Sequence, residues 1–273
     1  MLWNDDANVM LVAGHRGARK ICPENTMTAF RHAMDVGVDM IETDIRQTRD
    51  HRLVLMHDGR VDRTTDGEGL VREYSYQEFR SLNAAAHDEG FAREAPPCLE
   101  ELLEMVSAHP TMLMNLELKE YPHVEGEEMA YDTADKVVDM VEKYGLGERI
   151  IFNCFSGKLL SYMRKKYGRR YPLHGYYPYF YMGSDMGDPE TYLDVACVFH
   201  AELVGGQVRG LGGEIAPQAW FDYLLKRNIE PWIGAGVKTY DDLKLGFERG
   251  ARLVTSDDPG ETLAMLREMG HHR

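Results

Sequence analysis

Residues 38–57, with the sequence VDMIETDIRQTRDHRLVLMH, contain two apolar strand-like runs separated by a polar turn at 49–51. The runs Val38–Asp44 and Leu53–Met56 leave only eight residues between them, whereas a parallel crossover connection needs about a dozen or more. We therefore predict a hairpin that extends from the end of the first run. Its second strand would bring His57 back to the point where the hairpin begins.

Outside this hairpin, short apolar runs alternate with amphipathic stretches along the whole chain. The strand candidates are Val9–Ala13, Val38–Asp44, Leu53–Met56, Met112–Leu118, Ile150–Cys154, Leu173–Tyr176, Leu203–Gly206, Ile229–Ile233 and Leu253–Ser256. Helical stretches between them, such as 26–36, 134–144 and 240–249, each end at a glycine, which is a common helix terminator.

Eight strand candidates remain when the hairpin strand at 53–56 is set aside. Repeated strand–helix alternation with eight strands predicts an α/β fold, and specifically a (β/α)8 TIM barrel. A doubly wound sheet is the alternative, but no GxGxxG motif opens a helix after the first strand. Residues 58–110 contain turn signals and one helical piece, Ser75–Ala85, without a further barrel strand. We expect residues 1–273 to form a single barrel domain, with 58–110 as a small inserted subdomain.

The composition excludes several classes of partner. The chain of 273 residues has 31 Lys and Arg against 45 Asp and Glu, which gives a net charge of −14. Such a charge disfavours nucleic acid and anionic lipid surfaces. No run of 18 apolar residues is present, so we expect no membrane insertion. The N-terminus lacks the pattern of a signal peptide, which favours a cytoplasmic location, and the four cysteines form no CxxC pair for a metal–thiolate site.

Charged and polar residues gather where the predicted strands end. The motif Gly14-His15-Arg16-Gly17 follows the first strand directly, at what would be the catalytic face of a barrel. Glu42 and Asp44 stand two apart on the second strand, so both side chains point to the same side of it. Glu117 and Lys119 repeat this spacing at the end of the strand at 112–118.

These residues together indicate phosphoryl chemistry. Three carboxylates at one mouth repel one another, and a hard divalent cation such as Mg²⁺ or Ca²⁺ would relieve that repulsion. His15 and His57 can serve as acid and base, since an ordinary imidazole titrates near ~6.5. Arg16 and Lys119 can hold phosphate oxygens. A simpler interpretation remains for each cation alone, because Lys119 can merely neutralise Glu117 and Arg16 can pair with Glu24.

Three stretches of the chain resemble the glycerophosphodiester phosphodiesterase family. They are HRGARKICPENTMTAF at 15–30, GVDMIETDIRQTRDHRLVLMHDGRVDRTTDGEG at 37–69, and NLELK at 115–119. The resemblance implies a TIM barrel with a subdomain inserted after the His57-Asp58 motif. It further implies an acid–base pair (His15 and His57), three ligands of one Mg²⁺ or Ca²⁺ ion (Glu42, Asp44 and Glu117) and two phosphate-binding residues (Arg16 and Lys119).

The resemblance also implies a reaction and a substrate. A small-molecule glycerophosphodiester would be hydrolysed to glycerol 3-phosphate and an alcohol, through attack of the glycerol 2-hydroxyl on phosphorus and a cyclic phosphate. The chain departs from the family where Cys154-Phe155 replaces Ser-Phe and where Trp232-Ile233-Gly234-Ala235 replaces Trp-Thr-Val-Asn. We expect Trp232 to wall the glycerol pocket, with a core position as the alternative.

Two other functions remain open at this stage. The aromatic segment 174–181 is either a packed loop or a lid or pocket for the alcohol group, and the second possibility suits a lysophospholipase D-like hydrolase. A non-catalytic phosphodiester-binding barrel is the third interpretation. The presence of both His15 and His57 argues against it, because a binding protein needs no acid–base pair.

Overall fold

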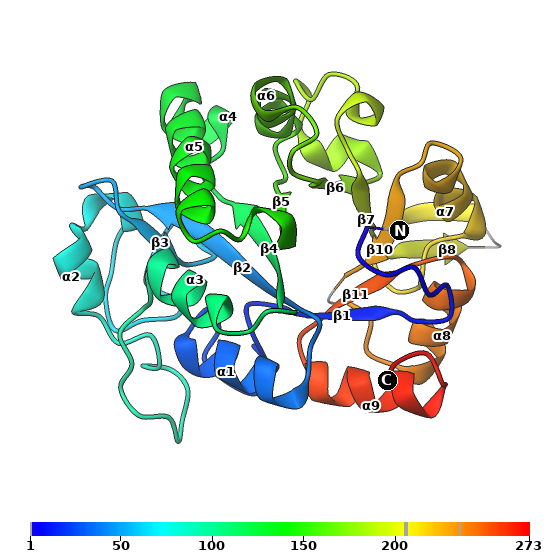
Figure 1. The fold of residues 1–273 in the computed structure, drawn as a ribbon, viewed down its shortest axis with the longest axis horizontal. Helices are drawn as coiled ribbons and strands as arrows, with labels where there is room; N and C mark the ends of the chain where they lie inside the picture. Colours follow the sequence, from blue (N-terminus) through cyan, green and yellow to red (C-terminus); the bar gives the residue numbers. More distant parts are fainter. Residues whose placement is uncertain (1, 205–206, 235) are drawn as a thin grey trace.

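The computed structural model describes residues 2–204, 207–234 and 236–273. Within them, eight parallel strands close into a barrel, because β1 pairs with both β2 and β11 (Figure 1). In order around the barrel they are β1 (Leu11–Gly14), β2 (Met40–Gln47), β4 (Leu113–Leu118), β5 (Ile150–Asn153), β6 (Leu173–Tyr177), β7 (Val195–Val198), β10 (Glu230–Ile233) and β11 (Leu253–Ser256). The predicted (β/α)8 barrel is confirmed.

Helices surround the barrel and cover the outer faces of its strands (Figure 1). They are α1 (Met27–Val36), α3 (Leu99–Ser107), α4 (Pro122–Glu125), α5 (Glu127–Lys143), α6 (Gly157–Tyr167), α7 (Gln218–Leu225), α8 (Tyr240–Glu248) and α9 (Pro259–Glu268). The ends of α1 follow from the sequence: the Thr26 hydroxyl accepts the Ala29 N–H at 3.1 Å, and Gly37 ends the helix with φ +94°. No helix among the described residues has the length and apolar character needed to cross a bilayer.

The predicted hairpin is confirmed. β2 continues beyond the barrel and pairs with β3 (Leu53–Leu55) in antiparallel register, with Ile45 opposite Leu55. The Met56 N–H then donates to the Asp44 carbonyl at 3.0 Å. This contact places His57, the next residue, at the carboxyl end of the barrel.

The chain between the hairpin and α3 packs beside the barrel and has a small core of its own. The apolar side chains of this core are Met56, Val61, Val71, Phe79 and Leu82, together with Val54 of β3. The predicted helical piece Ser75–Ala85 is α-helical only at α2 (Tyr76–Arg80). From Leu99 onward the chain rejoins the main core, since the buried apolar side chains of α3 pack there. The interpretation of 58–110 as an insertion within one domain stays a prediction.

The prediction of a barrel strand at 203–206 is wrong for residues 203 and 204, which the structure describes. β8 (Ala201–Val204) pairs with β9 (Gln207–Leu211) in a separate antiparallel hairpin, while residues 205 and 206 lie outside the described residues, as does Ala235. The barrel position belongs to β7, whose strand VACV lies parallel to β6 and β10. Both runs are short and apolar, so the sequence pattern alone did not distinguish them.

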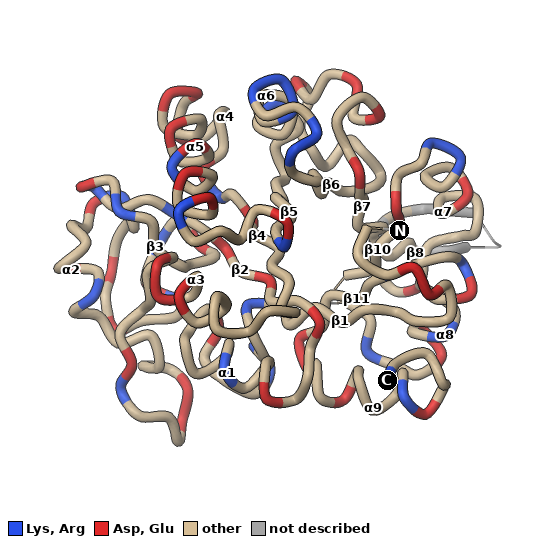
Figure 2. The backbone as a smooth tube through the Cα atoms, in the orientation of Figure 1, with Lys and Arg blue, Asp and Glu red and all other residues tan. Residues whose placement is uncertain are grey.

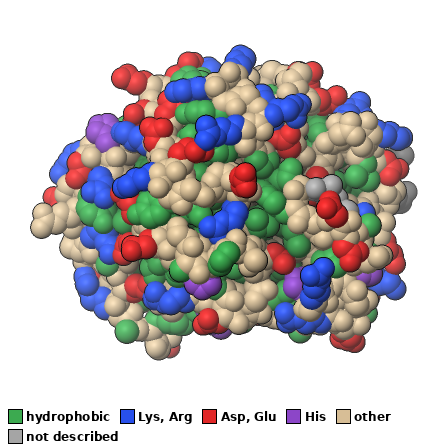
Figure 3. Space-filling model, in the orientation of Figure 1, with side chains coloured by type: hydrophobic (Ala, Val, Ile, Leu, Met, Phe, Trp, Pro, Cys, Tyr) green, Lys and Arg blue, Asp and Glu red, His purple; other side chains and the backbone are tan. Residues whose placement is uncertain are grey.

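Charged residues lie mainly on the outer helices and loops. Lys and Arg alternate with Asp and Glu along the tube in Figure 2 and over the face shown in Figure 3. The net charge of −14 is therefore spread over the molecule. The site at the barrel mouth has a separate charge pattern, which is set by the residues described next.

Candidate active site

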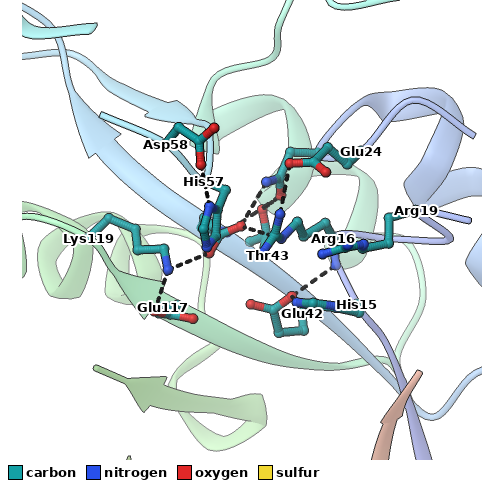
Figure 4. Close-up of polar contacts among 12 residues, drawn as sticks. His15, Arg16, Arg19, Glu24, Glu42, Thr43, His57, Asp58, Glu117 and Lys119 are labelled. Atoms are coloured by element: carbon teal, nitrogen blue, oxygen red, sulfur yellow. Dashed lines mark hydrogen bonds and ion pairs between the residues drawn. The ribbon is translucent and has the colours of Figure 1, made fainter. Parts of the chain in front are cut away.

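Three buried carboxylates meet at the carboxyl end of the barrel. Glu42 projects from β2 (Figure 4). Asp44 lies on the same strand, in register with Glu117 of the neighbouring strand β4. One oxygen from each of the three lies within 4.8 Å of the other two. Three hard oxygen donors at this separation suit a divalent cation such as Mg²⁺ or Ca²⁺. The structure thus brings together the three predicted ligands.

The burial of these carboxylates is only partly compensated. Burial, with the charges of Asp44 and Glu117 nearby, raises the pKa of Glu42 well above its usual range. Burial also acts to raise the pKa of Asp44, but Lys119 and Arg16 outweigh it and hold that pKa far below the ordinary range. The buried Oδ1 of Asp44 accepts no hydrogen bond from a described residue and has only the Lys119 ammonium at 3.3 Å. The donor set therefore fits a metal ion.

Arg16 is held by a tight turn after β1. A side chain on Gly14 would meet the Gly17 carbonyl at 2.5 Å, and Gly17 itself has φ +83°, so this turn requires glycine at both positions. The turn aims the Arg16 N–H at the Glu42 carboxylate, at 2.8 Å. The Arg16 guanidinium lies 2.9 Å from Glu24 and 3.2 Å from Asp44.

Lys119 sits on the other side of the carboxylates. Its ammonium donates to Glu117 at 2.6 Å and lies 3.3 Å from Asp44. The simple ion pairs expected for Lys119 and Arg16 are therefore present. Both residues also line the pocket at the mouth, so their positive charges face any bound ligand.

Each of the two predicted acid–base histidines is held by an aspartate. His15 Nδ1 lies 2.6 Å from Asp257, and His57 Nδ1 lies 2.6 Å from Asp58. The hydrogen bond fixes each ring and leaves Nε2 as the nitrogen available to a ligand. Burial lowers the pKa of His57, although the charge of Asp44 acts in the opposite direction.

Sequence reasoning missed the roles of both aspartates. Asp58 adjoins His57 in the chain, so the His-Asp dipeptide carried a local signal. Asp257 directly follows the last barrel strand, β11, but it is 242 residues from His15. Only the closure of the barrel brings these two residues together.

The role of Arg46 was also not predicted from the sequence. This residue lies in the hairpin part of β2 and holds the backbone of two site residues. Its guanidinium donates to the carbonyl of His57 at 2.9 and 3.1 Å and to the carbonyl of Lys119 at 3.3 Å. One buried side chain thus fixes the backbone of two site residues that are far apart in the sequence.

The pocket at the mouth has a volume of about 380 Å³ and two unlike walls. The charged wall contains six of the residues described above: His15, Arg16, Glu42, His57, Glu117 and Lys119. The facing wall, which we call the apolar wall, carries the rings of Phe155, Tyr176 and Phe199. Phe155 and Tyr176 stack with ring centroids 3.6 Å apart, and the Tyr176 hydroxyl donates to Glu117 at 3.4 Å, which joins this wall to the charged one. The pocket can hold a charged phosphodiester against one wall and an organic group against the other.

Some residues of the aromatic segment 174–181 line the pocket, and others pack against neighbouring elements. His174 and Tyr176 line the pocket, whereas Tyr177 packs against Trp220 and Tyr223 on the far side. Phe180 is 65% exposed. The two interpretations of this segment therefore apply to different residues within it.

Trp232 lies in the lower layer of the barrel interior. It is 1% exposed and packs in a cluster with Ala13, Met40, Ile151, Val195 and Leu253. Its ring lies 4.9 Å from that of His174, which forms part of the pocket floor. This placement matches the core alternative, because Trp232 reaches the pocket only through His174.

The mouth of this TIM barrel combines a carboxylate cluster, two aspartate-held histidines and two cations, a set of groups that suits phosphoryl chemistry. Residues 15–206, about seven tenths of the chain, match the profile of the glycerophosphoryl diester phosphodiesterase family. The chain belongs to this family.

Individual relatives agree with this assignment. The glycerophosphodiester phosphodiesterase of Caldanaerobacter subterraneus is 38% identical over 160 residues, which cover 57% of this chain and 62% of the relative. The chain thus spans about six tenths of the length of the curated relatives it matches.

Solved structures share the fold. A protein from Silicibacter pomeroyi superposes with a TM-score of 0.80 at 22% identity, covering 97% of this chain and 95% of that one. A phosphodiesterase from Oleispira antarctica, solved in complex with the product sn-glycerol-3-phosphate, gives 0.74 at 21% identity, covering 95% and 97%.

Proposed function

We propose that this chain is a metal-dependent hydrolase of glycerophosphodiesters that releases glycerol 3-phosphate and an alcohol. The observation that carries the proposal is the convergence of the carboxylate cluster with two aspartate-held histidines in one pocket. The family of the chain and the names of its relatives support the substrate class. The glycerol phosphate bound by the Oleispira antarctica neighbour supports the product.

Glu42, Asp44 and Glu117 would hold one divalent cation, either Mg²⁺ or Ca²⁺. When bound, such an ion neutralises charge on a phosphoryl oxygen. Arg16 and Lys119 alone do not balance three carboxylates, so a divalent ion would turn the local charge from negative to positive. This explains how an acidic protein would accept a phosphate ester, and it predicts weak substrate binding without metal.

The remaining residues would position the diester and move protons. Arg16 and Lys119 hold its non-bridging oxygens. One of His15 and His57 takes the proton of the glycerol 2-hydroxyl as that oxygen bonds to phosphorus, and the other protonates the departing alcohol oxygen. Water then adds to the cyclic phosphate, and the bond from phosphorus to the 2-oxygen breaks, which restores the hydroxyl. Glycerol 3-phosphate and the alcohol are the products.

The test is turnover of glycerophosphocholine by the purified chain, with release of glycerol 3-phosphate measured in Mg²⁺ or Ca²⁺ and in EDTA. We expect release with metal and its loss in EDTA. Binding of the substrate without release would instead indicate a phosphodiester-binding barrel. Release that is unaffected by EDTA would contradict the metal site.

A lysophospholipase D-like activity is the second candidate. The apolar wall of Phe155, Tyr176 and Phe199, with the exposed Phe180 nearby in the chain, could accommodate an acyl-bearing substrate. Lysophosphatidylcholine in the same assay separates the two functions. Cleavage of this lipid with no release from any deacylated glycerophosphodiester would replace the first proposal. The cytoplasmic location and the lack of a nucleic-acid partner stay predictions of the sequence.

A further inference from the structure

Arg63 bridges two carboxylates from different segments of the chain: Glu24, between β1 and α1, and Asp58, which follows the hairpin. It belongs to the segment that follows the hairpin, and it is not one of the proposed catalytic residues. Its Nε donates to Asp58 at 2.5 Å, and its two terminal nitrogens donate to the two oxygens of Glu24 at 2.6 and 3.0 Å. One guanidinium therefore binds both carboxylates at once.

Each of these carboxylates holds a functional side chain by its other contact. Asp58 binds His57 Nδ1, and Glu24 binds the guanidinium of Arg16 (Figure 4). The Arg16 guanidinium in turn lies 3.2 Å from Asp44. A continuous chain of ion pairs and hydrogen bonds thus runs from the histidine to the metal-binding cluster. Arg63 is the link between its two halves.

We propose that Arg63 is a positioning residue that fixes the His57 ring and the Arg16 guanidinium relative to each other. This inference rests on the proposed function, because it assigns Arg63 to the acid–base and phosphate-binding groups of that reaction. The proton donor or acceptor and the phosphate clamp must keep one geometry around the same phosphorus atom. A displacement of about 1 Å can cost on the order of 10²-fold in rate.

The chemistry of the bridge requires arginine. A guanidinium presents donors in a planar fork that can bind two carboxylates, whereas a lysine ammonium is a single point charge on a flexible stem. Hydrogen bonds from Arg63 help to lower the pKa of Glu24 and that of Asp58, which falls to about 2, although burial opposes both shifts. Both carboxylates therefore stay ionised, and their hydrogen bonds to Arg16 and His57 are retained.

A role in stability has to be separated from positioning by experiment. The Arg63 side chain is 48% exposed, but Glu24 and Asp58 are only 12% and 32% exposed. A bidentate pair within a network can contribute more to folding than the ~0–1 kcal/mol of an exposed ion pair, so stability is measured beside activity. Arg60 offers a matched control in the same segment. Its side chain is 59% exposed, and its one ion pair with a described residue is with Asp62, at 2.8 Å.

The experiment compares Arg63→Ala, Arg63→Lys and Arg60→Ala with wild type in steady-state turnover of glycerophosphocholine. We expect Arg63→Ala to lower kcat on the order of 10-fold and to raise KM several-fold, because it loosens both groups. Arg63→Lys should recover only part of the loss. Arg60→Ala should stay within about 2-fold of wild type, and the melting temperatures of all variants should agree within a few degrees.

Chemical rescue separates positioning from a structural role. Added guanidinium at millimolar concentration should restore part of the kcat of Arg63→Ala, since the exposed position leaves room for it, and should not raise that of Arg60→Ala. Wild-type-like kinetics in Arg63→Ala would overturn the proposal. A loss that guanidinium does not restore, with a lowered melting temperature, would also overturn it.

The outcome for the proposed function is read from wild type alone. If wild type releases no glycerol 3-phosphate from any glycerophosphodiester, that function fails. The placement of the side chains is then tested by a crystal structure of Arg63→Ala. Displaced His57 and Arg16 side chains would support the positioning role, and unchanged ones would overturn it.

Discussion

The two walls of the mouth are held together by different forces. On the charged wall, the ends of β1, β2 and β4 carry groups that are fixed by ion pairs, such as Lys119 with Glu117. On the apolar wall, the ends of β5, β6 and β7 carry rings that stack, such as Phe155 on Tyr176. Ion pairs demand particular partners at particular distances, whereas stacked rings tolerate replacement by other apolar groups. The charged wall would therefore fix the reaction at phosphorus, and the apolar wall would set the choice of alcohol.

The largest effect is expected from a carboxylate on the charged wall. Glu42→Gln should lower turnover roughly 10³-fold or more at limiting metal, because a bound cation contributes several kcal/mol to transition-state stabilisation. Calorimetry should show weakened metal binding, and excess cation should restore part of the activity. Glu100→Gln, which removes only an ion pair with Arg52, is the matched control. Unchanged metal affinity in Glu42→Gln would show that the ligand set is wrong.

The histidines should give the next largest effect. His57→Ala or His15→Ala should cost at least ~10²-fold in turnover, with metal binding retained, if the two residues act as acid and base. His32→Ala on α1 provides a control away from the mouth. Near-normal rates in either variant would remove that residue from the proposed reaction.

The apolar wall should respond differently. Phe199→Ala removes a ring that lies 5.6 Å from Tyr176, and aromatic pairs of this kind contribute ~0.5–1.5 kcal/mol. We expect roughly 2- to 10-fold changes in KM that depend on the alcohol, with kcat nearly retained. Equal effects on glycerophosphocholine, glycerophosphoethanolamine and glycerophosphoglycerol would break the distinction between the two walls.

The smallest effect concerns pH. The pKa of His57 is lowered in the folded protein, so below about pH 6.5 the unfolded chain binds more protons at this residue than the folded one. The free energy of unfolding should therefore fall as pH drops through that value. In metal-free protein, chemical denaturation of wild type and His57→Gln between pH 7.5 and 5 should show a smaller loss in the variant. A parallel decline in both would contradict the burial of the imidazole.

The sequence predicted the charged wall well because its signals are local. Glu42, Asp44 and His57 lie on one hairpin, and the short gap between its strands permits hardly any other connection. The strand at 195–198 was missed because the number of strands in a barrel does not reveal which of two short apolar runs is used. Trp232 could not be assigned either, since a strand position points to the barrel interior without fixing the depth of the layer.

Contacts between distant parts of the chain were beyond sequence reasoning. Arg63 is a charged residue in a turn-rich stretch, where most such residues are solvated. Its partner Glu24 lies 39 residues earlier, and only the folded segment brings the two together. The role of Arg46 could not be predicted either, because it binds two backbone carbonyl groups, and the sequence pattern does not indicate such contacts.

The contact between His15 and Asp257 can form only after the ribosome has added Asp257, near the end of synthesis. At ~5–20 residues per second, roughly 10–50 s separate the addition of these two residues by the ribosome. During that time the three carboxylates have already been made, but His15 has no aspartate and β1 has no β11 beside it. The nascent chain therefore has the parts of a metal site before it has a complete acid–base pair. Activity would arise only with the last strand, so a polypeptide cut short before β11 would be inert toward its substrate.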